Sequence, residues 1–437
     1  MKSRLVTHVQ SPSSNTTQDY TVTGFGTPDF AIVIAQEFAS ATPANTMNNG
    51  QGSGYVIGFT DGTTSHCAGA VVKDGVNPTN ADVGYSRIDT DDVVYYKRLK
   101  GDTAATADTP TFITDGLRLT WSTGTDRPGV SVILIQWDAG ESAKIGTFTS
   151  SGTVDTATTV TTTGVDPNFV WIFGISGTAA ADNDADDPCL SVGMAVDNGS
   201  SIDQFVHCHY RHDTARSNMH GAAAIAPDRA GLGFTTNFTT QYELEVTAMG
   251  TDDFSVTTRA GSGSVTAQTW MYLAVEFATP AELFLANAPT STGDWDAASM
   301  SFQPESVFVI PTMFNSDEAR STSGGGSKNQ SLYYANENSD EAYWHVYNNE
   351  SPSVTTSDAR FKYNNRLEWN GNVNGATPDG NADSGPTFDS SGVIWDVTNA
   401  PGHAYRTIIL GVFETPSGID PNPGPAHNRH YMHNLVR

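Results

Sequence analysis

The apolar residues of this 437-residue chain fall into short runs, rich in Val, Ile and Phe, that are too short for helices. Three of these runs follow a turn built on Pro and a polar residue: Phe30–Ile34, Phe169–Phe173 and Val307–Ile310. Short β-branched and aromatic runs that follow such turns predict strands. The prolines of the three turns lie 139 and 137 residues apart, so the same turn-and-strand motif recurs at a nearly constant period.

A second apolar run recurs near the far end of each period, around Leu134, Leu273 and Leu410. Matched on sequence, these leucines are again 139 and 137 residues apart. A third anchor, the run before this one, begins at Thr114, Thr251 and Ser390. Matched anchors at constant spacing predict that one unit is present three times, with its middle loops divergent.

The pattern therefore predicts an all-β protein of three tandem homologous antiparallel β-sandwich units, jelly-roll-like and each of about eight strands. The 41 Gly and 21 Pro agree with many turns, and only Pro280–Asn287 is a candidate for a helical turn. The predicted divisions are an N-terminal arm at 1–18, units at 19–145, 146–285 and 286–415, and a Pro-rich, basic C-terminal docking tail at 416–437.

The apolar strands indicate burial on both faces, because Ile32 and Ile34 alternate with the equally apolar Ala31 and Val33. Such strands lie between two sheets, or between a sheet and a neighbouring unit. The units could be beads on a string or a packed pseudo-threefold cluster. The connectors between them carry apolar residues that require burial, which favours the packed arrangement.

The charge is strongly acidic, with 48 Asp and Glu against 22 Lys and Arg and a net charge of −26. A field of this sign repels nucleic acid and anionic membranes, so we expect neither nucleic-acid binding nor membrane insertion. It also suits a protein adapted to salt water. The three cysteines, Cys67, Cys189 and Cys208, form no disulfide framework, and the start of the chain lacks the apolar core of a signal peptide. We therefore expect synthesis in a reducing host cytoplasm.

The two ends of the chain differ from its acidic body because they carry basic residues and no acidic ones. The first eight residues include Arg4, and the last twelve include Arg429, His430, Tyr431 and Arg437. Basic ends on an acidic chain predict docking onto an acidic partner surface through these residues, although two ordinary termini would look the same.

Two clusters are candidate metal sites. His207, His209 and His212 stand in one short segment, and the first two would share a face of a strand and suit Zn²⁺ or Ni²⁺. Asp182, Asp184 and Asp186 stand in an acidic loop that could hold Ca²⁺ but lacks the Gly and Glu of an EF-hand. The competing interpretations are solvated imidazoles and a solvated acidic loop. We expect no required cofactor, with Ca²⁺ as the open alternative.

No pattern of catalytic residues stands out, so we expect no enzyme activity. Gly324–Lys328 lacks the spacing of a phosphate-binding loop and reads as a loop tip. Aromatic residues gather in the third unit, at Tyr333, Tyr334, Tyr343, Trp344, Tyr347, Tyr363 and Trp369. They predict either packing across the sheet or a surface that stacks on sugars.

The opening phrase of the units, above all Thr23–Ile34, resembles a Gly-Phe-x-Pro-x-x-Val/Ile-x-Val/Ile strand found in structural proteins of tailed phages and of archaeal viruses. The resemblance covers the first and last strands of the units, and the third unit departs from it where Ser301 replaces Gly. It implies a virion component, either a capsid decoration or head-fibre protein or a part of the tail, and it implies no catalytic residues.

Two hypotheses of function follow. In the first, the chain is a structural protein of the virion that docks on a major capsid or tail protein and displays its sandwiches outward. It would act there as a homo-oligomer or as a pseudo-trimer of its own units. In the second, it is an adhesin or receptor-binding protein of the virion or cell surface that binds host glycans. A polysaccharide-degrading enzyme is a weaker third hypothesis.

Overall fold

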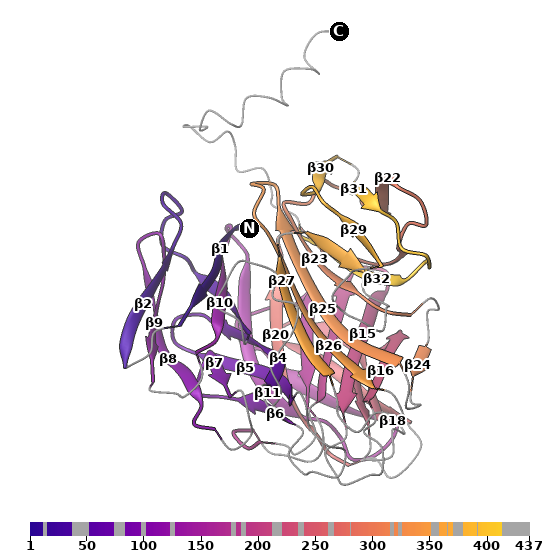
Figure 1. The fold of residues 1–437 in the computed structure, drawn as a ribbon. Helices are drawn as coiled ribbons and strands as arrows, with labels where there is room; N and C mark the ends of the chain where they lie inside the picture. Colours follow the sequence, from indigo (N-terminus) through magenta and orange to yellow (C-terminus); the bar gives the residue numbers. More distant parts are fainter. Residues whose placement is uncertain are drawn as a thin grey trace.

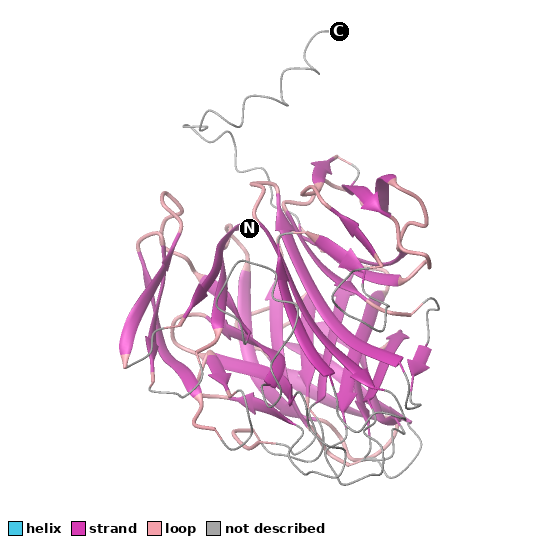
Figure 2. Cartoon of the chain, in the orientation of Figure 1, coloured by secondary structure: helices cyan, strands magenta, loops and turns pink. Residues whose placement is uncertain are grey.

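The computed structural model describes residues 1–11, 15–36, 52–73, 84–97, 102–122, 127–175, 181–184, 189–211, 221–234, 240–260, 266–279, 281–314, 319–321, 326–350, 358–364, 366–369, 379–390 and 392–412. In these residues all regular structure is strand (Figure 2), which confirms the predicted all-β fold. The paired strands are antiparallel, as expected for sandwiches. This part of the chain has no helix that is long and apolar enough to span a membrane.

The first ten strands form two sheets, which we call unit 1. The large sheet has the order β1 (Lys2–Gln10), β10 (Gly129–Gln136), β3 (Phe30–Gln36), β4 (Gly52–Thr60), β5 (Ser65–Lys73), β6 (Gly84–Asp89). The small sheet has the order β2 (Thr16–Thr21), β9 (Gly116–Trp121), β8 (Ala105–Ile113), β7 (Val94–Tyr96). The segment 1–18, expected to be an N-terminal arm, thus contributes to the sheets of unit 1, and its residues Lys2–Gln10 form the edge strand β1 of the large sheet.

The next ten strands repeat this order and form unit 2. The large sheet runs β11 (Ser142–Thr149), β20 (Thr269–Glu276), β13 (Phe169–Gly174), β14 (Cys189–Asp197), β15 (Ile202–Arg211), β16 (Gly221–Pro227) and ends with β24 (Ala319–Ser321), a strand contributed by unit 3. The small sheet runs β12 (Thr156–Thr161), β19 (Asp253–Ala260), β18 (Thr240–Gly250), β17 (Gly231–Phe234).

The remaining strands form unit 3 with the same order. Its large sheet runs β21 (Glu282–Asn287), β32 (Arg406–Val412), β23 (Ser306–Pro311), β25 (Gly326–Asn336), β26 (Glu341–Glu350), β27 (Asp358–Asn364). Its small sheet runs β22 (Gly293–Ser299), β31 (Gly392–Asn399), β29 (Gly380–Ala382), β28 (Leu367–Trp369), and β30 (Thr387–Asp389) also pairs with β31.

Strand pairing shifts three of the expected local features. Residues 280–287, the candidate for a helical turn, contain strand β21, because this apolar segment pairs with β32 along its whole length. Both β11 and β21 belong to the units that follow them, so the divisions fall between β10 and β11 and between β20 and β21, a few residues before the expected ones. In the residues that the structure describes, each of the first two units contributes ten strands, where about eight were expected.

The register of the last strand corrects the sequence match by one residue. Ile133 lies opposite Ile32, as Leu273 lies opposite Trp171 and Leu410 lies opposite Phe308. The equivalent of Leu273 is therefore Ile133 and not Leu134. Because side chains alternate along a strand, this slip of one residue places Leu134 on the opposite face.

The three large sheets share one central core, and the small sheets cover their outer faces (Figure 1). In β3, Phe30, Ile32 and Ile34 face the central core, whereas Ala31 and Val33 face the core of the unit 1 sandwich. Equivalent side chains of β13 and β23 enter the same central core, and separate sandwich cores fill units 2 and 3. Both faces of these strands are therefore buried, one by the unit itself and one by its neighbours.

The units are linked in a closed ring. The segment after β13 in unit 2 reaches the edge of unit 1, where the Asp182 amide donates to the Ile88 carbonyl of β6 at 2.8 Å. The segment after β23 in unit 3 supplies β24 to the edge strand β16 of unit 2. From the end of β3 in unit 1, the side-chain Nε2 of Gln36 donates to the His345 carbonyl of unit 3 at 3.0 Å. The packed arrangement is thus the one observed.

Candidate functional site

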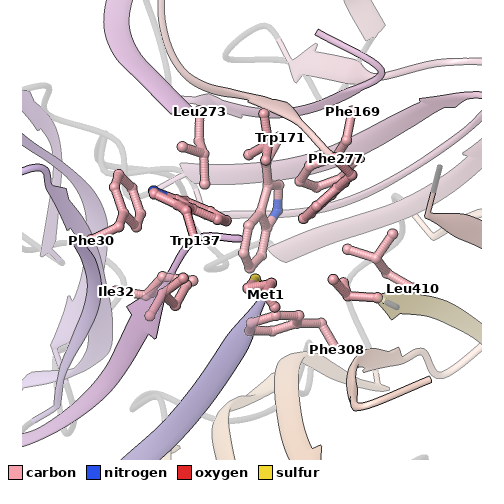
Figure 3. Close-up of a pocket in the computed structure, with 13 residues that line it drawn as sticks. Met1, Phe30, Ile32, Trp137, Phe169, Trp171, Leu273, Phe277, Phe308 and Leu410 are labelled. Atoms are coloured by element: carbon pink, nitrogen blue, oxygen red, sulfur yellow. The ribbon is translucent and has the colours of Figure 1, made fainter. Parts of the chain in front are cut away.

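The three large sheets meet around a small apolar pocket beside Met1 (Figure 3). All three units line it, through Phe30, Ile32, Ile135 and Trp137 of unit 1, Phe169, Trp171, Leu273, Val275 and Phe277 of unit 2, and Phe308, Leu410 and Val412 of unit 3. Its volume is about 20 Å³. An apolar cavity of this size holds at most a water-sized molecule, so it has neither the room nor the polar groups of a substrate site.

This pocket marks the end of the molecule at which the described chain begins and ends. The Met1 ammonium forms ion pairs with Asp138 at 2.8 Å and with the buried Glu141 at 2.9 Å. Val412, the last residue of β32, also lines the pocket. The segment that follows Val412 is therefore attached at the junction of the three units.

Arg4, expected to dock on a partner, is engaged within the chain. Its Nε lies 2.7 Å from Asp340 in the turn between β25 and β26 of unit 3. The same turn binds β1 through the Leu5 amide, which donates to Asp340 at 2.9 Å, and through Asn336, which donates to the Ser3 carbonyl at 3.0 Å. The contact joins a basic segment to an acidic one, but both belong to this chain. The other docking candidates, Arg429, His430, Tyr431 and Arg437, lie outside the described residues.

The expected histidine cluster is only partly described. His207 and His209 do lie on one face of β15, but both are buried, and His212 lies outside the described residues. His207 packs near the ring of Phe314 of unit 3, with ring centroids 6.5 Å apart, and neither of its ring nitrogens has a hydrogen-bond partner. Burial lowers the pKa of His207 to about 4, so the imidazole is neutral near pH 7.

The acidic loop contacts unit 1. Both Asp182 carboxylate oxygens accept from Thr90, one from its amide and one from its hydroxyl, at 2.7 Å each. Asp184 forms ion pairs with Lys97 at 2.7 Å and Arg87 at 3.5 Å. Asp186 lies outside the described residues. The two described carboxylates therefore fasten unit 2 to unit 1, and the described part of the chain brings no three His, Cys, Asp or Glu side chains together as a metal site.

The aromatic residues of unit 3 pack inside it. Tyr333, Tyr334, Tyr343, Trp344 and Trp369 are all fully buried, which is the packing interpretation. Tyr334 joins the central core, and its hydroxyl donates to Ser3 at 2.8 Å. The side chains of Tyr347 and Tyr363 are outside what the structure describes. The described aromatic faces are thus closed to a sugar ring.

Sequence reasoning missed the residues that receive these contacts, since Asp340, Thr90 and Lys97 stand in segments without a motif. For Asp340 and Lys97 the only signal is a charge opposite to that of the partner, which lies far away in sequence, and Thr90 carries no charge at all. Among the candidate residues, Arg4, Asp182 and Asp184 join one unit to another. Comparison of the chain with protein-family models, with curated proteins and with solved structures found no match.

Proposed function

We propose that this chain is a structural protein of a virion, which docks on a capsid or tail protein and displays its three sandwiches outward. The observation that carries the proposal is the closed ring of units around one shared core. A body in which each unit is fastened to both others is suited to a rigid, repeated part of a particle. The resemblance of Thr23–Ile34 to strands of virion proteins points to the same class.

The docking element in this proposal is the C-terminal segment. Arg4 is fastened to Asp340, so the basic residues proposed for docking are those of the C-terminal segment, Arg429, His430 and Arg437. That segment is attached after Val412, at the junction of the units, where one contact would orient all three sandwiches alike. On a chain of net charge −26, a basic segment recognises an acidic partner surface by charge.

The alternative, a glycan-binding adhesin, has less support. It rested on exposed aromatic faces in the third unit, and five of the seven named aromatic side chains are buried there. Trp344 in particular is 0 % exposed, so a loss of binding on changing it would report misfolding rather than a sugar contact.

The test is association with particles purified from the virus that encodes the chain. We expect the full chain to co-sediment with particles stripped of their own copy, and a variant that lacks residues 426–437 to lose this association. Arg429→Glu with Arg437→Glu should also weaken it, and increasing salt should weaken the binding of the full chain. The control is Arg118→Glu, a change of equal sign at an exposed site on unit 1.

Equal thermal midpoints of the full and shortened chains would show that the body is intact, because the deletion lies beyond β32. Undiminished association of the folded, shortened chain would overturn the docking proposal. Copy number per particle separates the two positions, since hundreds of copies indicate capsid decoration and a few dozen indicate the tail.

A further inference from the structure

Two of the three cysteines meet inside unit 2. Cys189 opens β14 and Cys208 lies near the end of β15, and the register places Cys208 opposite Ser191, two residues along from Cys189. The two sulfur atoms are 3.6 Å apart, and both side chains are 0 % exposed. They share a small core cluster with Val206, Ala224, Ala226 and Leu232.

We propose that Cys189 and Cys208 are a modification site that forms a disulfide when the protein meets a peroxide or a small disulfide oxidant. With hydrogen peroxide, one thiol loses its proton, and the resulting thiolate attacks a peroxide oxygen to give a sulfenic acid and hydroxide. The hydroxide takes up the released proton and leaves as water. The second thiol then attacks that sulfur and releases a second water. Both sulfurs are oxidised, the peroxide is reduced, and one S–S bond replaces two S–H bonds.

The geometry selects this pair. A disulfide needs a sulfur separation of about 2.05 Å, so the two sulfur atoms, now 3.6 Å apart, must approach by about 1.5 Å. The cysteines are diagonal neighbours in the ladder rather than directly opposite, so closing the bond requires a small shift of the ends of β14 and β15 together with side-chain rotation. Cys67, the remaining cysteine, lies on β5 in the core of the unit 1 sandwich, in a different cluster. The bond would tie β14 to β15 across a short loop of chain and stabilise unit 2 against unfolding.

The surroundings make the reaction slow. Burial, followed by the contact with Cys189, raises the pKa of the Cys208 thiol well above its ordinary value. Little thiolate is therefore present, and the oxidant enters only when the ends of β14 and β15 open. A pair of this kind stays reduced in a reducing cytoplasm and closes over a longer exposure outside it. That the oxidation takes place after particle release rests on the proposed virion function, whereas the chemistry of the cysteine pair does not.

The experiment uses the full chain, purified with reductant and then exposed to hydrogen peroxide over a time course. The protein is unfolded in N-ethylmaleimide, and its intact mass and non-reduced peptides are measured. The reduced chain should take one adduct on each of its three thiols. The oxidised chain should take a single adduct, on Cys67, should be lighter by two hydrogen atoms before alkylation, and should yield one linked peptide containing Cys189 and Cys208.

Variants and the unfolded state provide the controls. On oxidation, the variant Cys67→Ser should still lose both of its free thiols, those of Cys189 and Cys208. The variant Cys189→Ser should keep both of its free thiols, those of Cys67 and Cys208. Oxidation of the urea-unfolded chain should give mixed pairings, since the fold no longer selects one. Three adducts on the folded chain after full exposure, sulfinic products in place of the linked peptide, or covalent dimers would each overturn the proposal. Particle association plays no part in this measurement, so the disulfide proposal can fail or succeed independently of the proposed function.

Discussion

Arg4 and Asp340 form an ion pair, with 2.7 Å between Nε and Oδ2, although 336 residues separate them in the chain. The pair fastens the first strand of unit 1 to a turn of unit 3. We expect Arg4→Ala to lower the free energy of unfolding by about 1 kcal/mol, as for a partly exposed ion pair. Asp340→Ala should cost about 2 kcal/mol, because the Leu5 amide also loses its acceptor.

Urea unfolding followed by circular dichroism measures both changes. The exposed pair of Arg118 and Asp19 is the control, and Arg118→Ala should leave the unfolding midpoint where it is. A larger loss from Arg4→Ala than from Asp340→Ala would contradict the assigned role of Asp340 as the centre of the contact.

Trp171 joins the three units in the central core. Its ring lies 5.8 Å from that of Phe59 in unit 1 and 5.3 Å from that of Phe308 in unit 3, between ring centroids. We expect Trp171→Ala to lower the free energy of unfolding by about 4 kcal/mol, through lost burial and the cavity that remains. Fluorescence and circular dichroism should still report one common transition. Separate transitions for separate units would show that the ring does not unfold as one body, and Val154→Ala on the surface is the control.

His207 makes stability depend on acid. Burial lowers its pKa to about 4 in the folded chain, against an ordinary value of 6.5. As the pH falls, the unfolded state therefore binds a proton before the folded state does. The contribution of the neutral imidazole to the free energy of unfolding is fully present above pH 6.5 and is lost as pH falls toward 4. We therefore compare the free energy of unfolding of His207→Leu with that of the parent at two pH values. From pH 8 to pH 5 this difference should shift in favour of the variant by on the order of 2 kcal/mol. Denaturant midpoints at both values measure this, and a constant difference would refute it.

Glu341 acts in the opposite sense. Burial raises its pKa to about 7 from an ordinary 4.5, and the Tyr333 hydroxyl donates to it at 2.8 Å. The folded state holds this proton more tightly than the unfolded state does. The contribution of the protonated Glu341 to the free energy of unfolding is therefore fully present below pH 4.5 and is lost as pH rises through 7. Glu341→Gln keeps an acceptor for Tyr333 and carries no charge. We expect it to exceed the parent in stability by on the order of 2 kcal/mol at pH 8, with the advantage shrinking by pH 5.

The same unfolding series at the two pH values measures this change. Tyr333→Phe provides the matched control, since it removes the hydrogen bond and leaves the carboxyl group in place. A variant Glu341→Gln that is less stable than the parent at pH 8 would show that the carboxylate is charged and well accommodated there.

Local pattern was a good guide to strands and a poor guide to their partners. The alternation of Ala31, Ile32, Val33 and Ile34 predicted burial on both faces, and both faces are buried. Matching Leu134 to Leu273 was wrong by one residue, because several apolar residues in a row leave the register open to a slip. Only pairing across the sheet fixes which residue faces which core.

The candidate residues divide in the same way. That His207 and His209 share a face followed from the period of a strand, but the sequence did not show that both are buried or that Phe314 of unit 3 packs near His207. The acidic loop was recognised from composition, whereas its contacts with Thr90 and Lys97 depend on how unit 2 meets unit 1. The Tyr and Trp residues of unit 3 were ambiguous until their burial was known.

By itself the sequence determined the all-β class, the recurring strands and the acidic charge, because these depend on periodicity and composition along the chain. The tertiary structure decided how the units close into a ring, that Arg4 meets Asp340, and that two of the three cysteines touch. These relationships join residues that are far apart in sequence, and no local preference records them. They exist because the large sheets are apolar on both faces and must bury the second face against one another.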